Sequence, residues 1–448
     1  MRLQTGSDPI LWSSCLAMLA VGANSTAIMA ALPLMKDELS LTSAGVQWAV
    51  NAYLVMSAAC VVAGGRAADR FTARRSSTAG LALFGLASCL IASAETQATL
   101  LAGRALQGLA AAFAVPGTLA AINAGAAPER RQSAIGAWTG FLMLGFSIGP
   151  LLGGGVTHLA GWRMVFWLNV PLTLVALAGL VFAGGARGPA GKTSTGPVDA
   201  AGFVLLATFM VSVVFGLHAL PQAGITPLPA IGPLVLAVVA LLLLRHVEAR
   251  ASAPMVNLGF FARREFVTGA AIAALAMFCI MSLLLYFNLY AQSRDGLGLT
   301  SSEAGALLLP LGASLLALAL SASALSARMS LRKAITGGMA AIVPACALAG
   351  AAVAMGSIPL LAVGFFMMGA GLAVPYALAP RLALSALPAE QAGQGAGIVN
   401  ASTFLGGSIG VAAGAMAFTT AGFIGTLAMI ALAGAAGAAL GRRIPETP

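Results

Sequence analysis

Residues 133–156 read SAIGAWTGFLMLGFSIGPLLGGGV and contain no charged side chain. A run of about 20 apolar residues is the length that an α-helix needs to cross the hydrocarbon core of a bilayer. Its glycines recur at Gly145, Gly149 and Gly153, a four-residue spacing that places them on one helix face and permits close approach of a neighbouring helix. This stretch therefore predicts a membrane-spanning helix that packs through glycine.

The rest of the chain shares this character. Its 448 residues are 59% hydrophobic and 8% charged, whereas soluble domains carry about 25% charged residues. Because so few charges cannot cover a water-soluble globule, an ordinary soluble enzyme, a disordered chain and a disulfide scaffold are excluded. The five cysteines lie inside apolar runs and form no CxxC pair, so neither disulfides nor a zinc site is expected. We expect no metal, no cofactor and, for want of a polar basic face, no nucleic-acid partner.

Fourteen stretches are apolar and long enough to span a bilayer. The sequence therefore predicts an all-α polytopic membrane protein with fourteen transmembrane helices in the lipid bilayer. We divide it into a six-helix bundle (1–186), a linker with two extra helices (187–250) and a second six-helix bundle (251–448). The predicted spans are 9–34, 48–65, 77–95, 98–122, 133–156, 164–185, 200–220, 226–244, 267–291, 302–325, 334–355, 357–379, 392–418 and 420–440.

The basic residues support this count. With fourteen spans, alternate loops share a side of the membrane, and one side then receives 19 of the 23 Lys and Arg residues. The other side receives three, and Arg104 lies within a span. Since cytoplasmic loops are enriched in Lys and Arg, both termini are predicted to lie in the cytoplasm. A paired error, such as residues 200–244 not spanning, would preserve the alternation.

An internal repeat relates the two bundles. Residues 145–153 read GFSIGPLLG and residues 406–414 read GGSIGVAAG, with five identities in nine positions. These segments belong to the fifth and thirteenth spans, which cross the membrane in the same direction. The repeat is therefore parallel, as between the two halves of a rocking-bundle transporter, and the seventh and eighth spans are left over between the halves.

Several motifs occupy fixed places in the first bundle. The loop after the second span reads GGRAADRFTARR (64–75), the fourth span contains RALQG (104–108), and the fifth contains the glycine run with Pro150. The stretch that follows reads GWRMVFWLNVP (161–171). In these motifs the chain strongly resembles the major facilitator superfamily and, more narrowly, its fourteen-helix drug:proton antiporter family.

This resemblance implies a major facilitator fold and a secondary active transporter, not an enzyme. Such a protein exports small amphipathic organic compounds, drug-like or metabolite, by alternating access in exchange for protons. The resemblance also implies a multi-pass monomer in a bacterial-type inner membrane. An uncoupled facilitator and a non-transporting sensor with the same fold stay open as alternatives. A membrane enzyme would need paired acids or a histidine cluster at one depth, and the sequence offers neither.

The loop after the second span is the first candidate site. By resemblance it is a conformational latch, in which a carboxylate pairs with arginines in one state and releases them in the other. The alternative is a solvated loop that only sets topology. Thr72 stands where the family usually has glycine. The latch residues are Gly65, Asp69, Arg70, Arg74 and Arg75.

The glycine run of the fifth span is the second candidate. It permits close helix packing, and Pro150 is expected to bend the helix. A bent, glycine-faced helix is also suited to seal the transport path on one side. The residues of this helix gate are Gly145, Gly149, Pro150, Gly153 and Gly154.

Arg104 is the sharpest candidate, since a basic residue inside a span is a functional-site hypothesis by default. Counting from the span ends places Arg104 and Asn24 near one depth, and the family usually has Asp where this chain has Asn24. Arg104 either meets the substrate or a proton-linked group, or acts as a structural strut. The residues predicted to line a substrate or proton path are Asn24, Asn51, Tyr53, Arg104, Gln107, Tyr286, Asn288, Tyr290, Glu303, Phe365, Tyr376 and Asn400.

Proton coupling needs a group that titrates, and none of the 13 acidic residues falls at the centre of a predicted span. Glu303, at the outer start of the tenth span, is the best remaining carboxylate. His218, near the outer end of the seventh span, is the alternative, although a lone histidine there is more often an interfacial polar residue.

Overall fold

The computed structural model describes residues 9–182, 199–219, 228–251, 254–388 and 391–444, without the side chains of 69–71, 128–129, 132, 228 and 323–328. The described residues form helices and short connections. The helices are α1 (Pro9–Glu38), α2 (Ser43–Phe71), α3 (Ala73–Ala92), α4 (Gln97–Gly125), α5 (Pro128–Ala160), α6 (Trp162–Trp167), α7 (Asn169–Phe182), α8 (Ala200–Ala219), α9 (Leu228–Glu248), the 3-10 helix η1 (Leu258–Ala262), α10 (Arg264–Gln292), α11 (Ser301–Leu307), α12 (Leu309–Arg328), α13 (Leu331–Ala354), α14 (Ile358–Ser385) and α15 (Ala392–Gly441).

Over the described residues, thirteen helical segments are long and apolar enough to cross a bilayer. The last of them, α15, is two helices that meet at Ala421 and Gly422, where the backbone leaves the helical region. Gly422 has a φ of 60°, which glycine adopts without steric cost. Counted as two, the parts of α15 bring the spans to the predicted fourteen.

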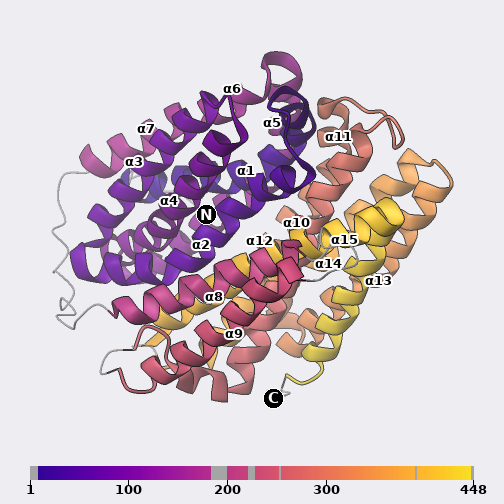
Figure 1. Ribbon diagram of the computed structural model, residues 1–448. Coiled ribbons are helices and arrows are strands. Elements are labelled where there is room, and N and C mark those ends of the chain that lie inside the picture. The colour runs from indigo at the N-terminus through magenta and orange to yellow at the C-terminus, as the bar shows by residue number, and fades with distance from the viewer. Residues whose placement is uncertain (1–8, 183–198, 220–227, 252–253, 389–390, 445–448) are drawn as a thin grey trace.

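The first and last groups of helices form two halves, seen in indigo to violet and in orange to yellow in Figure 1. In each half the fifth span packs on the first, α5 on α1 and α15 on α10. The repeated glycines make both contacts, because a Cβ on Gly145 would lie 2.6 Å from the Leu19 carbonyl oxygen and one on Gly410 would lie 2.5 Å from that of Phe278. The internal repeat is thus a repeat of helix packing.

Two seams join the halves. In the first seam α5 packs against α11 and α12, and in the second α2 packs against α15. The accessory helices α8 and α9 pack on each other, and α8 also contacts both α2 and α15 (Figure 1). The accessory pair therefore adjoins the second seam.

Candidate functional site

Helix α5 uses its glycines on two faces. Gly153 faces α1, where an added Cβ would overlap the carbonyl of Ala27, and Gly154 faces α11, where it would overlap the carbonyl of Ser301. The Ser301 hydroxyl donates to the Gly154 carbonyl at 3.1 Å. Two consecutive glycines thus contact different halves of the molecule, whereas a Cβ added to the next one, Gly155, would have no atom of the described residues within 4 Å apart from its own helix.

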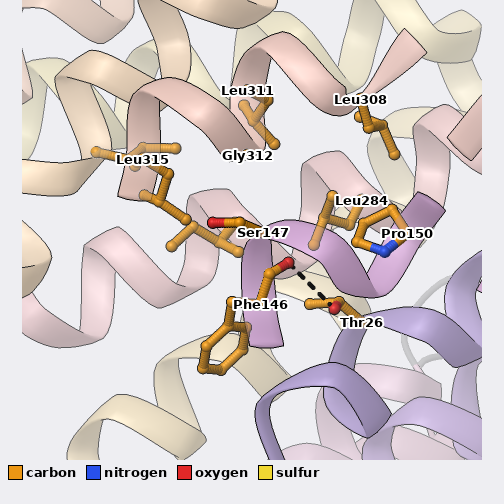
Figure 2. Close-up of a pocket in the computed structure, with 11 residues that line it drawn as sticks. Thr26, Phe146, Ser147, Pro150, Leu284, Leu308, Leu311, Gly312 and Leu315 are labelled. Atoms are coloured by element: carbon orange, nitrogen blue, oxygen red, sulfur yellow. Dashed lines mark hydrogen bonds between the residues drawn. The ribbon is translucent and has the colours of Figure 1, made fainter. Parts of the chain in front are cut away.

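Small residues of the C-terminal half complete the first seam. A Cβ on Gly312 would lie 2.5 Å from the Ser147 carbonyl oxygen, and Gly305 faces the carbonyl of Pro150 in the same way. Figure 2 shows this region, where the Thr26 hydroxyl donates to the Phe146 carbonyl at 3.2 Å. The cavity between the halves at this point measures ≈ 10 Å³, about the space of one water molecule, so the first seam is closed.

A polar cluster lies inside the N-terminal half, where α1, α3, α4 and α7 converge. Asn169 donates from Nδ2 to Asn24 Oδ1 at 2.9 Å, and Gln107 donates from Nε2 to Ser88 Oγ at 2.8 Å. Asn24 and Gln107 also approach each other at 3.4 Å through their side-chain amides. All four side chains are buried. Buried polar groups that satisfy one another in this way fix the positions of the helices that carry them.

Arg104 adds a cation to this polar cluster. Its side chain is fully buried and donates from Nε to the Ala49 carbonyl at 2.8 Å and from Nη1 to Gln107 Oε1 at 2.7 Å. The guanidinium carbon lies 4.7 Å from the ring centroid of Tyr53. Nη2 is buried and has no hydrogen-bond partner among the described residues. Arg104 and Asn24 therefore share one cluster, as their expected depth implies, with Gln107 between them and no acidic residue among these partners.

A second polar cluster crosses the second seam. The Ser408 hydroxyl of α15 donates to Asn51 Oδ1 of α2 at 2.9 Å. Asn51 Nδ2 lies 2.5 Å from Nε2 of His218, which α8 supplies. His218 is 3% exposed. His218, the alternative proton carrier, is thus buried between helices near the end of α8, because α8 packs against α2 and α15.

The remaining path candidates of the C-terminal half are mostly packed within that half. Tyr286 donates to the Val411 carbonyl at 2.5 Å, Tyr290 stacks on Phe423 with centroids 5.2 Å apart, and Phe365 packs edge-on to Phe287 at 4.8 Å. Each of these side chains has a structural partner on another helix of its half.

Four other candidates have different surroundings. Asn288 donates to the Leu284 carbonyl on its own helix at 2.8 Å. Tyr376 faces the first seam, 6.2 Å from the ring of Phe146, and Asn400 is half-buried. Glu303 is exposed and accepts from both the backbone N–H and the hydroxyl of Thr300, which completes a capping box at the start of α11. A helix cap thus accounts for the Glu303 carboxylate.

The candidate latch lies where α2 ends and α3 begins. The side chains of Asp69 and Arg70 are outside the described residues. Arg74 donates to the Val181 carbonyl, and Arg75 is exposed. Gly65 has open space where a Cβ would be, whereas its neighbour Gly64 abuts the carbonyl of Ala112.

Three residues of these clusters were not predicted as site residues. Asn169 belongs to the noted stretch after the fifth span, and Ser408 is the serine that the internal repeat shares with Ser147. Both residues belong to motifs noted in the sequence, but the sequence assigns no role to the individual polar side chains of those motifs. Ser88 carries no such signal, since a serine in an apolar helix most often bonds its own backbone, as Ser88 does with Phe84 at 2.8 Å.

Residues 14–411 match the Major Facilitator Superfamily. The chain belongs to this superfamily. It is a multi-pass membrane transporter, and its relatives include resistance and efflux proteins. The transporter is 30% identical to the tetracenomycin C resistance and export protein of Streptomyces glaucescens, over 90% of this chain and 74% of that protein. It is 28% identical to multidrug resistance protein Stp of Mycobacterium tuberculosis (89% and 73%) and 27% identical to quinolone resistance protein NorB of Staphylococcus aureus (91% and 87%).

Solved structures agree on the architecture. A crystal structure of the peptide transporter POT in complex with alafosfalin superimposes with a TM-score of 0.72, over 99% of this transporter and 96% of that chain. The two sequences are 15% identical. This likeness shows that the transporter has the major facilitator fold.

Proposed function

We propose that this transporter exports small amphipathic organic compounds from the cytoplasm by alternating access, in exchange for protons. It acts as a monomer in a bacterial-type inner membrane, with both termini in the cytoplasm. The names of the relatives support export, since they are resistance proteins and one is also an export protein. The closed first seam supports alternating access, because contacts through small residues at a seam can separate without unfolding either half.

The buried cation carries the substrate part of the proposal. Arg104 is fully buried, has one unpartnered Nη2 and bonds only neutral groups among its hydrogen-bonding partners. An uncompensated charge inside a membrane protein is costly and marks a functional site by default. A bound compound that approaches this cluster therefore meets a positive potential, and we assign the transporter neutral or anionic substrates in preference to cations.

Two further elements complete the proposed cycle. The Gly154–Ser301 contact closes the outer side of the path and must separate when the substrate leaves. Asp69 with Arg70, Arg74 and Arg75 forms a latch on the cytoplasmic side that holds one conformation and releases in the other. Glu303 is left out of the proton path, because it caps α11 at the surface.

The substrate preference is tested in everted membrane vesicles with chloramphenicol, a neutral probe, and ethidium, a lipophilic cation. We expect the wild type to transport chloramphenicol at least about tenfold better than ethidium. Asn24→Asp would add a negative charge beside Gln107, cancel the charge of the cluster and move this ratio toward ethidium by about tenfold. One unit charge at about 10 Å and an effective dielectric constant of about 20 contributes ~1.7 kcal/mol. Asn24→Ala removes all side-chain hydrogen bonds of Asn24 without adding a charge, and this control shows what the loss of those bonds alone does to the ratio.

The outcomes separate the alternatives. If the wild type transports ethidium as well as chloramphenicol and Asn24→Asp leaves the ratio unchanged, Arg104 is a structural strut. Dissipating the pH gradient should stop uphill transport by an antiporter, whereas a facilitator would continue to move the probes downhill. A protein that binds compounds in a thermal-shift screen but moves none in vesicles would be a sensor.

A further inference from the structure

The accessory helix α8 places a titratable side chain at the second seam. His218 is 3% exposed, its Nε2 lies 2.5 Å from Asn51 Nδ2, and Asn51 Oδ1 accepts from the Ser408 hydroxyl at 2.9 Å. The imidazole ring also packs 5.0 Å from the ring of Trp48. One side-chain network therefore ties α8 to α2 of the N-terminal half and to α15 of the C-terminal half.

The orientation of the Asn51 amide assigns the hydrogen-bonding roles around His218. With Oδ1 accepting from Ser408, the amide presents Nδ2 to Nε2, and because Nδ2 can only donate, Nε2 accepts in this arrangement. The single ring proton of a neutral histidine is then on Nδ1, for which the described residues provide no hydrogen-bond partner. With this amide orientation, Nε2 is the ring nitrogen that can accept a proton.

The charged groups of the neighbouring helices lie far from His218. On α9, Arg245, His246 and Glu248 are at the opposite end, where Glu248 and Asp199 border Gly202 near the start of α8. Sixteen helical residues separate Gly202 from His218, or about 24 Å at 1.5 Å per residue.

The other two neighbours, α2 and α15, have no charged residue of their own at this level, although the Arg104 side chain of α4 bonds to the Ala49 carbonyl of α2. Helix α15 contains no charged residue from Ala392 to Gly441, and residues 220–227 contain no titratable side chain. On α2 the charged residues are Arg66, Asp69 and Arg70, all near its far end, and Tyr53 faces Arg104. Of the described groups that contact this network, His218 is thus the one whose side chain has an unprotonated nitrogen that can accept a proton.

We propose that His218 is the proton-binding residue of the transport cycle, so that the accessory helix α8 belongs to the transport machinery. This inference rests on the proposed proton antiport. Hydronium on the external side transfers a proton to the lone pair of Nε2: the N–H bond of imidazolium forms as an O–H bond of hydronium breaks and leaves water. Release of the same proton toward the cytoplasm regenerates the neutral ring.

Protonation is incompatible with the present contact. Imidazolium has two N–H donors and no acceptor, so Nε2–H and Asn51 Nδ2–H would face each other. Either the amide turns, which gives Oδ1 to the imidazolium and withdraws it from Ser408, or His218 moves away from α2. Both changes alter the contacts at the second seam, and they link proton binding to the separation of the two halves.

The test uses the full-length transporter in proteoliposomes that contain a pH-sensitive dye. His218→Gln keeps an acceptor for Asn51 but does not titrate, and His246→Gln changes the other histidine of the accessory pair as a control. We expect His218→Gln to lower chloramphenicol-driven proton movement at least tenfold, while chloramphenicol counterflow, which needs no net proton transfer, stays within about twofold of the wild type. His246→Gln should match the wild type in both assays.

Two results would overturn the inference in different ways. If the wild type moves chloramphenicol but no protons, the proposed antiport itself fails. If the wild type couples the two and His218→Gln couples them equally well, the antiport stands and His218 is not its proton site.

A second variant tests the proposal if His218→Gln does not fold. Ser408→Ala frees Asn51 Oδ1 to accept from imidazolium, so the pH profile of export should move to higher pH with maximal export retained. An unchanged profile in Ser408→Ala would contradict the role of His218, because a merely structural histidine has no reason to shift it.

Discussion

Thr72 joins α2 to α3 with a φ of 124° and a ψ of 141°, a backbone conformation that a β-branched residue adopts only with strain. Its hydroxyl accepts from the backbone N–H of Arg75 at 3.3 Å and caps α3. This is the position at which the family usually has glycine. The resemblance therefore identified a residue whose backbone has a positive φ, a conformation that favours glycine, although its side chain is threonine.

We expect Thr72→Gly to raise the free energy of unfolding by about 1 kcal/mol. Strain of about 1–3 kcal/mol is relieved, against a few tenths for the weaker cap and about 0.5–1 kcal/mol for the added freedom of the unfolded chain. Thr72→Ala keeps the strain and loses the cap, so it should be less stable than the wild type. Thermal unfolding in detergent ranks the three proteins, and Thr72→Gly ranking lowest would contradict the strain.

At the residue scale, the sequence predicted which polar residues belong to the site better than it predicted which of them bond to each other. The matching depths of Asn24 and Arg104 could be counted from the span ends, and both side chains are in one cluster. That Gln107 lies between them depends on how α1 and α4 are rotated about their axes, which is set by packing. The same rotation brings Ser88 and Asn169 into contact with the cluster.

At the level of helices, α5 illustrates how one element takes part in two kinds of contact. Its contact with α1 lies within the N-terminal half, and its contact with α11 crosses the first seam. Substitutions on the two faces should therefore have different effects, the first on folding and the second on the balance between closed and open conformations.

Gly153, Gly154 and Gly155 offer a matched series for this difference. Gly153→Ala places a methyl group against the Ala27 carbonyl and should cost about 1–3 kcal/mol of stability. Gly155→Ala meets open space and should be neutral or slightly stabilising. Gly154→Ala should leave the unfolding temperature near that of Gly155→Ala but favour opening of the first seam, because the methyl group overlaps the Ser301 carbonyl.

Opening is measured with a cysteine introduced at Ser302 in a cysteine-free background, labelled by a membrane-impermeant maleimide. Gly154→Ala should increase the labelling rate several-fold over Gly155→Ala. Equal rates would mean that the seam does not depend on this glycine, and normal stability in Gly153→Ala would contradict the packing of α5 on α1.

The sequence predicted that each spanning helix exists, but it did not predict the residues at which the helices end. The two last spans were expected to meet near residue 419, and the break in α15 is at Ala421 and Gly422. Apolar composition continues through this point, so only the backbone freedom of Gly422 marks it. The second contact face of α5 could not be predicted either. In the sequence Gly153 and Gly154 belong to one glycine run, and only the position of α11 in the structure shows that they contact different helices.

Over the whole molecule, the distribution of basic residues predicts the orientation. Alkaline phosphatase fused after Glu95 or Arg294 should be active, because it reaches the external side, and fusions after Arg131 or Arg250 should be inactive. The reason is the excess of Lys and Arg in cytoplasmic loops. Expression of each fusion is checked by immunoblotting, and an active fusion at Arg250 would mean that α8 and α9 do not both cross the membrane.

The sequence is most informative at this largest scale. Span number and repeat follow from hydrophobicity, charge and glycine spacing, and the family was indicated by the resemblance of its motifs. All of these are properties of the chain itself and need no knowledge of spatial neighbours. The seams could not be predicted in the same way, because Asn51, His218 and Ser408 are separated by 167 and 190 residues along the chain, as their numbers show. Only the packing of α8 on α2 and α15 brings them together.

The accessory pair also has an evolutionary consequence. A hairpin of two spans returns the chain to the side from which it left, so a gene can acquire one between two halves without inverting the second half. Because the buried Asn51 and Ser408 share a hydrogen-bond network with His218 of that hairpin, a variant that lacks α8 and α9 would have to satisfy the Asn51 amide in another way.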